Sequence, residues 1–357
     1  MLNATTEGGD AQTVEPADAS GPVRIVDIAA ELGLSVATVS RALNGVATVK
    51  PEVAEKVREH ARRRGYVRNR LAKSLRSRTR TFIGFLVPDV ENLAYAIAAD
   101  ACAKYVSRLG YQMILAISGD DPQSECAALR SLAEAQVAGL IVAPTAGITP
   151  ASRALLRGRS VVEFNRLSGL SQHSVVCDDR AAFSDAARHL LQLGHRSFGY
   201  IGTTDAVSNG EERLDGFRTQ LQTHGHRLPH NRTRLLPPTE KDGYRAAWEL
   251  LSGTRLPTAL VVGSSSLSMG VARAVRELGV KVPQQMSLVV YGDSRWGALY
   301  EPALTTITAP YQLMARTVAD LVADLVSADG ERPDSPVRLP AELLVRQSTG
   351  PPPGRNR

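Results

Sequence analysis

The length and composition of the chain exclude a small single domain and a membrane protein. Its 357 residues exceed what one hydrophobic core usually supports, which predicts two or three folding units. Hydrophobic residues make up 43% and charged residues 22%, as in soluble globular proteins, and no run approaches the roughly 20 apolar residues of a membrane span. Cys102, Cys126 and Cys177 show no paired spacing, which favours reduced thiols. We expect a cytoplasmic protein without a membrane partner.

The charge is distributed unevenly along the chain. Residues 1–22 carry four acidic residues and no Lys or Arg, which predicts a disordered tail and argues against a secretory signal. Residues 23–80 carry 14 Lys and Arg against 5 Asp and Glu, a net charge of +9, whereas residues 81–357 carry a net charge of only +1. A basic segment of this kind favours a nucleic-acid partner, although a solvated charged surface remains the alternative.

Three short helices are predicted in the basic segment. The first runs over about 26–32, the second begins after Ser35 as N-cap and reaches about Leu43, and the third begins at Pro51 and ends at Gly65. A tight turn between the first two predicts a helix-turn-helix, whose second helix enters the major groove. The outer face of that helix is small and polar except for Arg41, which can contact a guanine edge. A generic helical hairpin is the alternative.

Two runs in this segment carry a more specific pattern. Residues 27–45, which include GLS at 33–35, TVSR at 38–41 and LNG at 43–45, resemble the DNA-binding headpiece of the lac repressor (LacI/GalR) family, and residues 65–76 (GYVRNRLAKSLR) resemble its hinge. In that family the hinge folds on DNA and a leucine pair enters the minor groove; Leu75 matches that leucine. The resemblance implies DNA contacts from Ser35, Val36, Ala37, Thr38, Ser40, Arg41, Asn44, Asn69, Ala72, Lys73, Leu75 and Arg76.

The chain also departs from the family pattern at several positions. Arg24 stands where the family usually has Thr, so we expect the first helix to lack its usual cap. Lys50 replaces a usual Ser, Val53 a usual Thr, and Arg68 a usual Pro. These departures put the DNA target in question rather than the fold.

From Thr81 onward, apolar runs alternate with amphipathic stretches, which predicts parallel sheets with helices on both faces and, from the length, two α/β lobes. The expected strands are 82–87, 113–117, 140–143, 161–164, 198–201, 260–262 and 288–291. The expected helices are 94–109, 125–135, 182–193, 212–224, 243–251 and 269–278.

The family resemblance continues over this region, to about Thr349, through weak motifs in a characteristic order, such as LGHR at 193–196 and ERLDGF at 212–217. It implies an N-terminal all-α helix-turn-helix headpiece with a hinge helix and a C-terminal α/β two-lobe periplasmic-binding-protein-like sensor domain. The implied domains are 23–68 (headpiece), 69–80 (hinge), 81–349 (effector binding and dimerisation; N-lobe 81–177 and 309–325, C-lobe 180–306 and 330–349) and 350–357 (flexible tail). By analogy with periplasmic sugar-binding proteins, the chain should cross between lobes near 177–180, 306–310 and 319–329.

Ligands of open parallel sheets bind outside the carboxyl ends of the strands, which here means the cleft between lobes. Arg213 and Asp293 match the ligand-contacting Arg and the late Asp of the family, although surface or structural ion pairs are the alternative. An Arg and a carboxylate suit a polyol, a sugar or an anion. The effector candidates are Asp89, Tyr95, Asn165, Arg166, Arg213, Ser264 and Asp293.

Departures in this region weaken the expectation of an ordinary hexose. Ser264 and Ser265 replace a usual Asn-Asp, and 93–95 (LAY) replace a usual Pro-Phe-Phe, leaving Tyr95 as one aromatic instead of two. A different effector, or none, is therefore an open alternative.

Enzyme and metal chemistry find no support in the motifs. The chain has neither a P-loop nor a strand–GxGxxG–helix fingerprint, and we expect no catalytic residues, cofactor or metal. His224, His226 and His230 lie in a polar loop without Cys or acidic partners, which favours a solvated loop. The expected function is that of a homodimeric regulator, a repressor, that binds a pseudo-palindromic double-stranded DNA operator under control of a sugar-like effector. A constitutive repressor, an architectural protein and a sugar-binding protein without DNA function are the alternatives.

Overall fold

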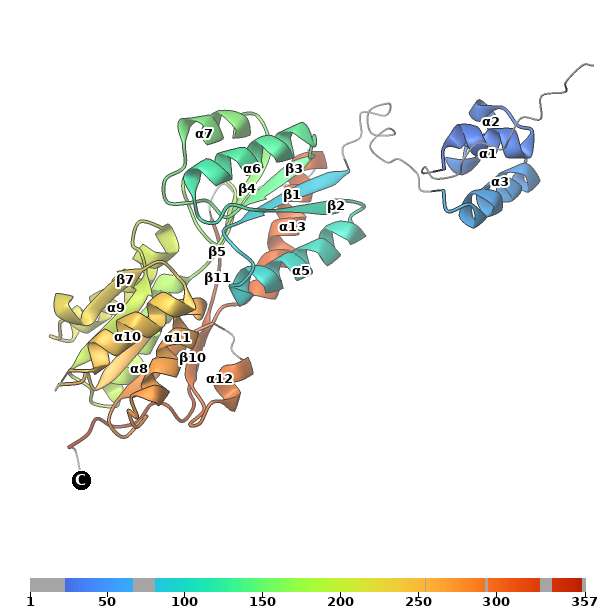
Figure 1. Ribbon diagram of the computed structural model, residues 1–357. Helices are drawn as coiled ribbons and strands as arrows, with labels where there is room; N and C mark the ends of the chain where they lie inside the picture. Colours follow the sequence, from blue (N-terminus) through green and yellow to red (C-terminus); the bar gives the residue numbers. More distant parts are fainter. Residues whose placement is uncertain (1–22, 67–80, 254, 293–294, 328–335, 355–357) are drawn as a thin grey trace, which may run out of the picture. The chain divides into compact units, whose positions relative to one another are not determined.

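The computed structural model describes residues 23–66, 81–253, 255–292, 295–327 and 336–354. The chain divides into two compact units, Met1–Thr79 and Arg80–Arg357 (Figure 1). The expected N-terminal tail and the expected hinge, 69–80, lie outside the described residues.

The first unit holds three helices, α1 (Ile25–Leu32), α2 (Val36–Leu43) and α3 (Pro51–Arg63). Gly33 ends α1 with φ of 62°, a left-handed conformation that glycine adopts without steric cost. The helices share a small core in which Ile28, Val39 and Val57 are fully buried. This core holds α1 and α2 in the predicted helix-turn-helix.

The second unit contains two six-stranded sheets among its described residues. Sheet A has the order β11-β5-β4-β3-β1-β2, and all of its paired strands are parallel. Its strands are β1 (Phe82–Val87), β2 (Gln112–Ile117), β3 (Gly139–Val142), β4 (Ser160–Phe164), β5 (Ser174–Cys177) and β11 (Val337–Leu339). Helices α5 (Leu93–Arg108) and α13 (Tyr311–Ser327) cover one face, and α6 (Pro122–Glu134) and α7 (Pro150–Leu156) cover the other (Figure 1).

Sheet B has the order β12-β10-β9-β8-β6-β7, in which only β12 runs antiparallel to its neighbour. Its strands are β6 (Phe198–Thr203), β7 (Thr233–Leu236), β8 (Ala259–Gly263), β9 (Ser287–Tyr291), β10 (Thr305–Thr308) and β12 (Glu342–Leu344). Helices α8 (Asp179–Gln192) and α9 (Ser208–Thr223) pack on one face, and α10 (Glu240–Leu251) and α11 (Ser265–Glu277) on the other; a 3-10 turn, η1 (His230–Arg232), and the short α12 (Arg295–Leu299) complete the lobe.

The chain passes between the two lobes three times. The first passage joins β5 to α8 and the second joins β10 to α13, close to the expected positions at 177–180 and 306–310. The third expected passage, at 319–329, was wrong. Val318 and Val322 of α13 are fully buried against sheet A, so this helix stays in the first lobe. Because β11 pairs in sheet A and β12 in sheet B, the passage lies between Leu339 and Glu342, and 337–339 does not belong to the C-lobe as expected.

Each strand and helix expected beyond Thr81 is present, with ends shifted by a few residues. The elements that were not predicted from the sequence are β5, β7, β10, β11, β12, α7, α12 and α13. The missed strands have three or four residues each, too few for a periodic pattern to show. No helix within the described ranges combines the length and apolar character needed to cross a bilayer.

The start of the expected flexible C-terminal tail is held by hydrogen bonds. The Gly350 amide donates to Ser287 Oγ at 3.0 Å, and the Gly350 carbonyl lies 2.9 Å from His195 Nε2. The expectation was therefore wrong at Gly350, because the buried His195 and Ser287 side chains hold its backbone. Residues 355–357 lie outside the described part of the chain.

Candidate functional site

The second helix of the N-terminal unit presents a polar face to solvent. Ser35 caps α2, because its Oγ accepts the Thr38 amide proton at 3.1 Å and lies 2.8 Å from Thr38 Oγ1. Val39 is fully buried, whereas Arg41 on the opposite side is exposed. A side chain at this place is free to reach outward, as a base-contacting residue must.

The other expected DNA-contacting residues of α2 fall into two groups. Ser35, Val36, Ala37 and Asn44 are exposed, and Thr38 and Ser40 are half-buried, with Asn44 Nδ2 donating to Ser40 Oγ at 3.4 Å. The hinge candidates Asn69, Ala72, Lys73, Leu75 and Arg76 lie outside the described residues.

As expected, α1 lacks the usual side-chain cap, since the Arg24 side chain makes none. The Arg24 amide, however, donates to Asp27 Oδ2 at 2.7 Å, so the first turn is stabilised by its own third residue. The carboxylate near the helix N-terminus also interacts favourably with the helix dipole.

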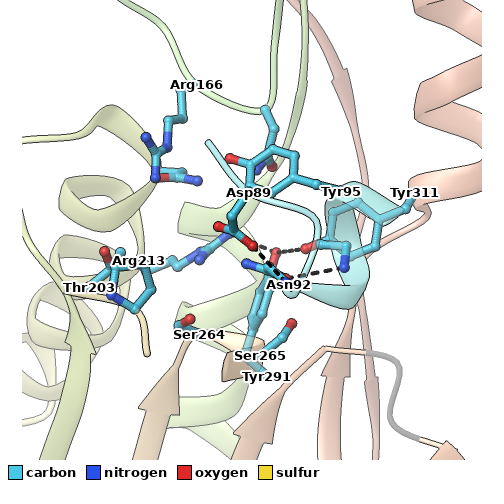
Figure 2. A pocket seen from close by; sticks show the side chains of 14 residues that line it. Asp89, Asn92, Tyr95, Arg166, Thr203, Arg213, Ser264, Ser265, Tyr291 and Tyr311 are labelled. Atoms are coloured by element: carbon cyan, nitrogen blue, oxygen red, sulfur yellow. Dashed lines mark hydrogen bonds between the residues drawn. The ribbon is translucent and has the colours of Figure 1, made fainter. Parts of the chain in front are cut away.

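In the second unit, a pocket lies between the lobes at the carboxyl ends of the strands (Figure 2). Of the expected effector residues, six line it: Asp89, Tyr95, Asn165, Arg166, Arg213 and Ser264. The seventh, Asp293, lies outside the described residues. The pocket thus brings together residues that are far apart in the sequence, at the edge where ligands of parallel sheets bind.

Arg213 is the most constrained charged side chain of the pocket. Its Nη2 lies 2.9 Å from Asp179 Oδ2 and donates to Tyr291 Oη at 2.9 Å, while Nη1 donates to the Gly263 carbonyl at 3.0 Å. Tyr291 Oη donates to Asp179 Oδ1 at 3.0 Å, and Tyr311 Oη donates to Tyr291 Oη at 3.3 Å. Burial opposes ionisation of Asp179 and raises its pKa, although the adjacent Arg213 guanidinium favours the charged carboxylate. The Asp179 carboxylate in turn raises the pKa of Arg213.

Helix packing explains how Arg213 meets Asp179. Asp179 opens α8 and Arg213 lies on α9, and the two helices approach closely at Gly216. A Cβ on Gly216 would come within 2.2 Å of the Arg180 carbonyl oxygen, so no larger residue fits without moving one helix. The alternative of a surface ion pair at Arg213 is therefore excluded, because the pair is buried, whereas Arg213 does form a structural ion pair with Asp179.

Arg166 and Asn165 form the opposite wall, directly after β4. Arg166 Nη1 and Nη2 lie 2.5 and 3.1 Å from the two carboxylate oxygens of Asp120, and Nη1 also donates to the Pro144 carbonyl. Asn165 has φ of 62°, a conformation that Asn tolerates better than most residues, and its Nδ2 donates to Tyr95 Oη at 3.2 Å. Both guanidinium groups of the pocket are thus held in place by carboxylates.

The pocket contains buried polar atoms without a protein partner. They are Asn165 Oδ1, Arg166 Nε, Thr203 Oγ1, Asn209 Oδ1 and Arg213 Nε, and each of these side chains is at least nine-tenths buried. An unpaired buried polar group costs about 1–3 kcal/mol, so clustering of five in one pocket indicates a place built for a hydrogen-bonding occupant. Donors and acceptors are both present, which suits hydroxyl groups.

Sequence reasoning missed several lining residues. Asn209 precedes Arg213 by one helical turn on α9, so helical spacing could have found it. Thr203 and Tyr291 are the last residues of β6 and β9, so the expectation that ligands bind at the carboxyl ends of the strands could have found them too. Tyr311 gave no local signal, because its place depends on the second passage between lobes. Among the described residues, no cluster of three or more His, Cys, Asp or Glu could hold a metal ion.

Comparison with known proteins agrees with this architecture. Residues 24–69 match the model of bacterial regulatory proteins of the lacI family, and residues 187–349 match that of the periplasmic binding protein-like domain. The chain belongs to the LacI family of bacterial regulatory proteins. It is a DNA-binding transcriptional regulator with a periplasmic binding protein-like domain, and not an enzyme.

Relatives of this LacI-family chain match between 76% and 92% of it. It is 29% identical to catabolite control protein A of Priestia megaterium over 334 residues, covering 92% of this chain and 99% of the relative. It is similar in fold to a lac repressor dimer bound to operator and the anti-inducer ONPF, with 23% identity, a TM-score of 0.81, and coverage of 92% and 100%. A LacI family transcriptional regulator from Mycobacterium smegmatis is 26% identical, with a TM-score of 0.68 and coverage of 76% and 99%.

Proposed function

We propose that the chain is a repressor that binds a pseudo-palindromic operator as a homodimer and changes its affinity for DNA when a small polar molecule occupies the pocket between its lobes. The observation that carries the effector part of this proposal is the cluster of unpartnered buried polar atoms in that pocket. The similar lac repressor structure is a dimer bound to operator together with a small molecule, which supports the same combination here.

The DNA-reading part rests on the exposed face of α2. Arg41 has the length and fork geometry to contact guanine N7 and O6, and the smaller Ser35, Ala37 and Ser40 let the helix approach the groove. A two-fold dimer presents two such helices, so the operator should consist of two related half-sites about one helical turn apart. The hinge positions Leu75 and Arg76 are proposed to contact the minor groove between them.

The regulatory part rests on the three passages between lobes. A ligand bonded to Arg213 and Thr203 in one lobe and to Asn165 and Arg166 in the other would favour one lobe arrangement. Such a ligand shifts DNA affinity only by its difference in binding energy between the two arrangements. The residues contributed by both lobes give it a means to create that difference.

One observation favours the alternative of a constitutive DNA binder. In this arrangement the pocket leaves a free volume of only about 20 Å³, enough for about one water molecule, and Arg213 is already paired within the protein. A constitutive regulator would keep this arrangement permanently, whereas a ligand-controlled one must open it.

Selection of random duplex DNA by the purified protein, with and without a pool of bacterial metabolites, tests the proposal. A two-fold symmetric site whose enrichment changes with the pool supports ligand control. A symmetric site that responds to no fraction of the pool favours the constitutive regulator, and an asymmetric site contradicts the dimer.

Leu75 gives a test of the hinge. Leu75→Ala should leave the thermal unfolding of the protein unchanged but reduce both operator affinity and the bend of the duplex, because the apolar wedge is lost. A DNA bend equal to that of the wild type in a circular-permutation gel assay would contradict the assignment.

A further inference from the structure

A second cavity adjoins the first pocket, on the other side of Arg166. Arg166 lines both, and the second cavity has a volume of about 220 Å³. Its walls come from the loops after β3 and β4 and from α7 in one lobe, and from the start of α9 with the segment before it in the other: Pro144, Thr145, Ala146, Ile148, Arg153, Arg166, Leu167, Ser168, Ala206, Val207 and Ser208. Most of the free space in this part of the cleft therefore lies outside the first pocket.

The N-terminus of α9 borders this cavity. Helix α9 spans 16 residues, and its N-cap, Val207, supplies no side-chain hydrogen bond to the first turn. The first amide groups of a helix point outward and carry partial positive charge, so an uncapped N-terminus is a favourable place for an anion. Gly210 has no room for a side chain here, because a Cβ would lie 2.0 Å from the Thr204 carbonyl oxygen.

Two arginines border the same cavity, and one of them has an unsatisfied donor. Arg166 is 4% exposed and its Nε has no partner, although Asp120 holds its two terminal nitrogens. Arg153 of α7 is exposed, and its Nη2 donates to the Ser168 carbonyl at 3.3 Å. No carboxylate in the described residues forms an ion pair with Arg153, so its charge is available to a ligand.

We propose that the second cavity binds the anionic group of the effector, a phosphate or a carboxylate, while its hydroxyl-bearing part occupies the first pocket. This inference rests on the proposed function and deepens it: the effector is a polyol that carries an acidic group, such as a sugar phosphate or a sugar acid. The α9 amides and the Arg153 guanidinium bind the anion, and Arg166, at the junction, donates its free Nε proton.

The charges of the two pockets agree with this division. In the first pocket Arg213 is neutralised by Asp179, so that pocket suits a neutral group. In the second, Asp120 neutralises Arg166 and leaves Arg153 and the helix N-terminus as positive contributions. Further acids lie near this cavity. Glu211, in the first turn of α9, is exposed and does not line the cavity, and Glu163 accepts hydrogen bonds from Ser168 and Leu170. Glu125 accepts the amide proton of the cavity-lining Thr145, and burial raises the pKa of Glu125, which disfavours its charged form.

The proposal is tested on the full chain by isothermal titration with inorganic phosphate at constant ionic strength, then with glucose, glucose 6-phosphate and gluconate. We expect saturable phosphate binding and at least tenfold tighter binding of one anionic sugar than of glucose. Tighter binding of glucose 6-phosphate identifies a phosphate, and tighter binding of gluconate a carboxylate. Equal affinities for all three sugars, or no saturable binding of phosphate or gluconate, would overturn the proposal.

Two pairs of variants locate the site. Arg153→Gln should weaken phosphate binding at least fivefold, whereas Arg157→Gln, at the exposed end of the same helix and outside the cavity, should not. Ser208→Asp and Ser208→Asn both remove the hydroxyl that accepts the Leu167 amide, but only the first places a carboxylate at the α9 N-terminus. Ser208→Asp should abolish phosphate binding and Ser208→Asn should retain it; equal effects within either pair would refute the location.

Failure of this inference is distinguishable from failure of the proposed function. Phosphate titration needs no DNA, and operator selection needs no anion. A protein whose symmetric site responds only to neutral metabolites would retain the proposed function and lose the anionic subsite.

Discussion

Arg213 Nη2 lies 2.9 Å from Asp179 Oδ2, and the two side chains are 5% and 1% exposed, so the cleft is built around a buried ion pair. Tyr291 donates to the same carboxylate, and Tyr311, from the start of α13 in the other lobe, donates to Tyr291. The ion pair is therefore linked by hydrogen bonds across the lobes. Any change to it should alter both stability and the communication between lobes.

Removing the charge of Asp179 should be costly. Asp179→Asn leaves the Arg213 guanidinium buried without a counter-charge, and we expect a loss of about 3–5 kcal/mol in the free energy of unfolding, measured in urea. Asp179→Leu combined with Arg213→Met should recover much of that loss, because no charge then remains buried. As a control, Asp215→Asn removes a carboxylate that pairs with Arg180 in a much more exposed ion pair, and it should cost less than about 1 kcal/mol. Similar losses in both single variants would contradict the structural role of the buried pair.

The close approach of α8 and α9 should not tolerate a methyl group. Gly216→Ala would place a Cβ 2.2 Å from the Arg180 carbonyl oxygen, and overpacking of this kind destabilises by about 1–3 kcal/mol. Chemical denaturation of the full chain measures this loss in the free energy of unfolding. Gly253→Ala is the matched control, since its Cβ meets no atom within 4 Å, and it should change stability by less than about 0.5 kcal/mol. A Gly216→Ala protein as stable as this control would show that the helices are not constrained there.

Base reading by Arg41 gives a prediction about specificity. Arg41→Ala should weaken binding to the selected operator by about 1–3 kcal/mol and relax the preference at one base pair of each half-site. Arg58→Ala, on α3 where Arg58 bonds to Glu55, should leave base preference unchanged. Repeating the selection with each variant measures both. An unaltered preference at every position in the Arg41 variant would remove this residue from base readout.

Acidic pH should weaken the second unit through His195. Its Nε2 lies 2.9 Å from the Gly350 carbonyl, which can only accept, so this nitrogen carries a proton and Nδ1 faces Thr258 Oγ1 at 3.0 Å. Burial lowers the pKa of His195 below its ordinary value of 6.5, and burial lowers that of the neighbouring His189 as well. Below about pH 6.5 His195 is therefore protonated in the unfolded chain but stays neutral in the folded chain. The free energy of unfolding falls as the pH decreases from there through the pKa of His195 in the folded protein.

A pH series of unfolding free energies checks this direction. His195→Asn should be less stable at neutral pH, because it loses hydrogen bonds, but its stability should decline less steeply between pH 7 and 5. His224→Asn, at the exposed end of α9, is the control. A slope in the His195 variant as steep as in the wild type would mean that other groups cause the decline.

Much of the fold was predictable from local pattern. The helix-turn-helix follows from Gly33, Ser35 and the spacing of Val39 and Leu43, which all act within one or two turns of helix. The parallel sheets follow from apolar runs that alternate with amphipathic stretches. The expectation that ligands bind at the carboxyl ends of parallel strands correctly indicated the edge of the sheets where the pocket lies, and six effector candidates line this pocket.

Tertiary structure alone decided which of these residues meet, and how. Nothing local in the sequence pairs Arg213 with Asp179, brings Tyr311 to Tyr291, or shows that α13 stays with sheet A while the chain crosses after β11. The spacing of apolar residues indicates which face of a helix or strand is buried, because each side chain is selected for burial or exposure at its own position. Partners across a cleft depend on how whole helices and sheets pack, and that is determined by the close approaches and long-range contacts of the folded chain.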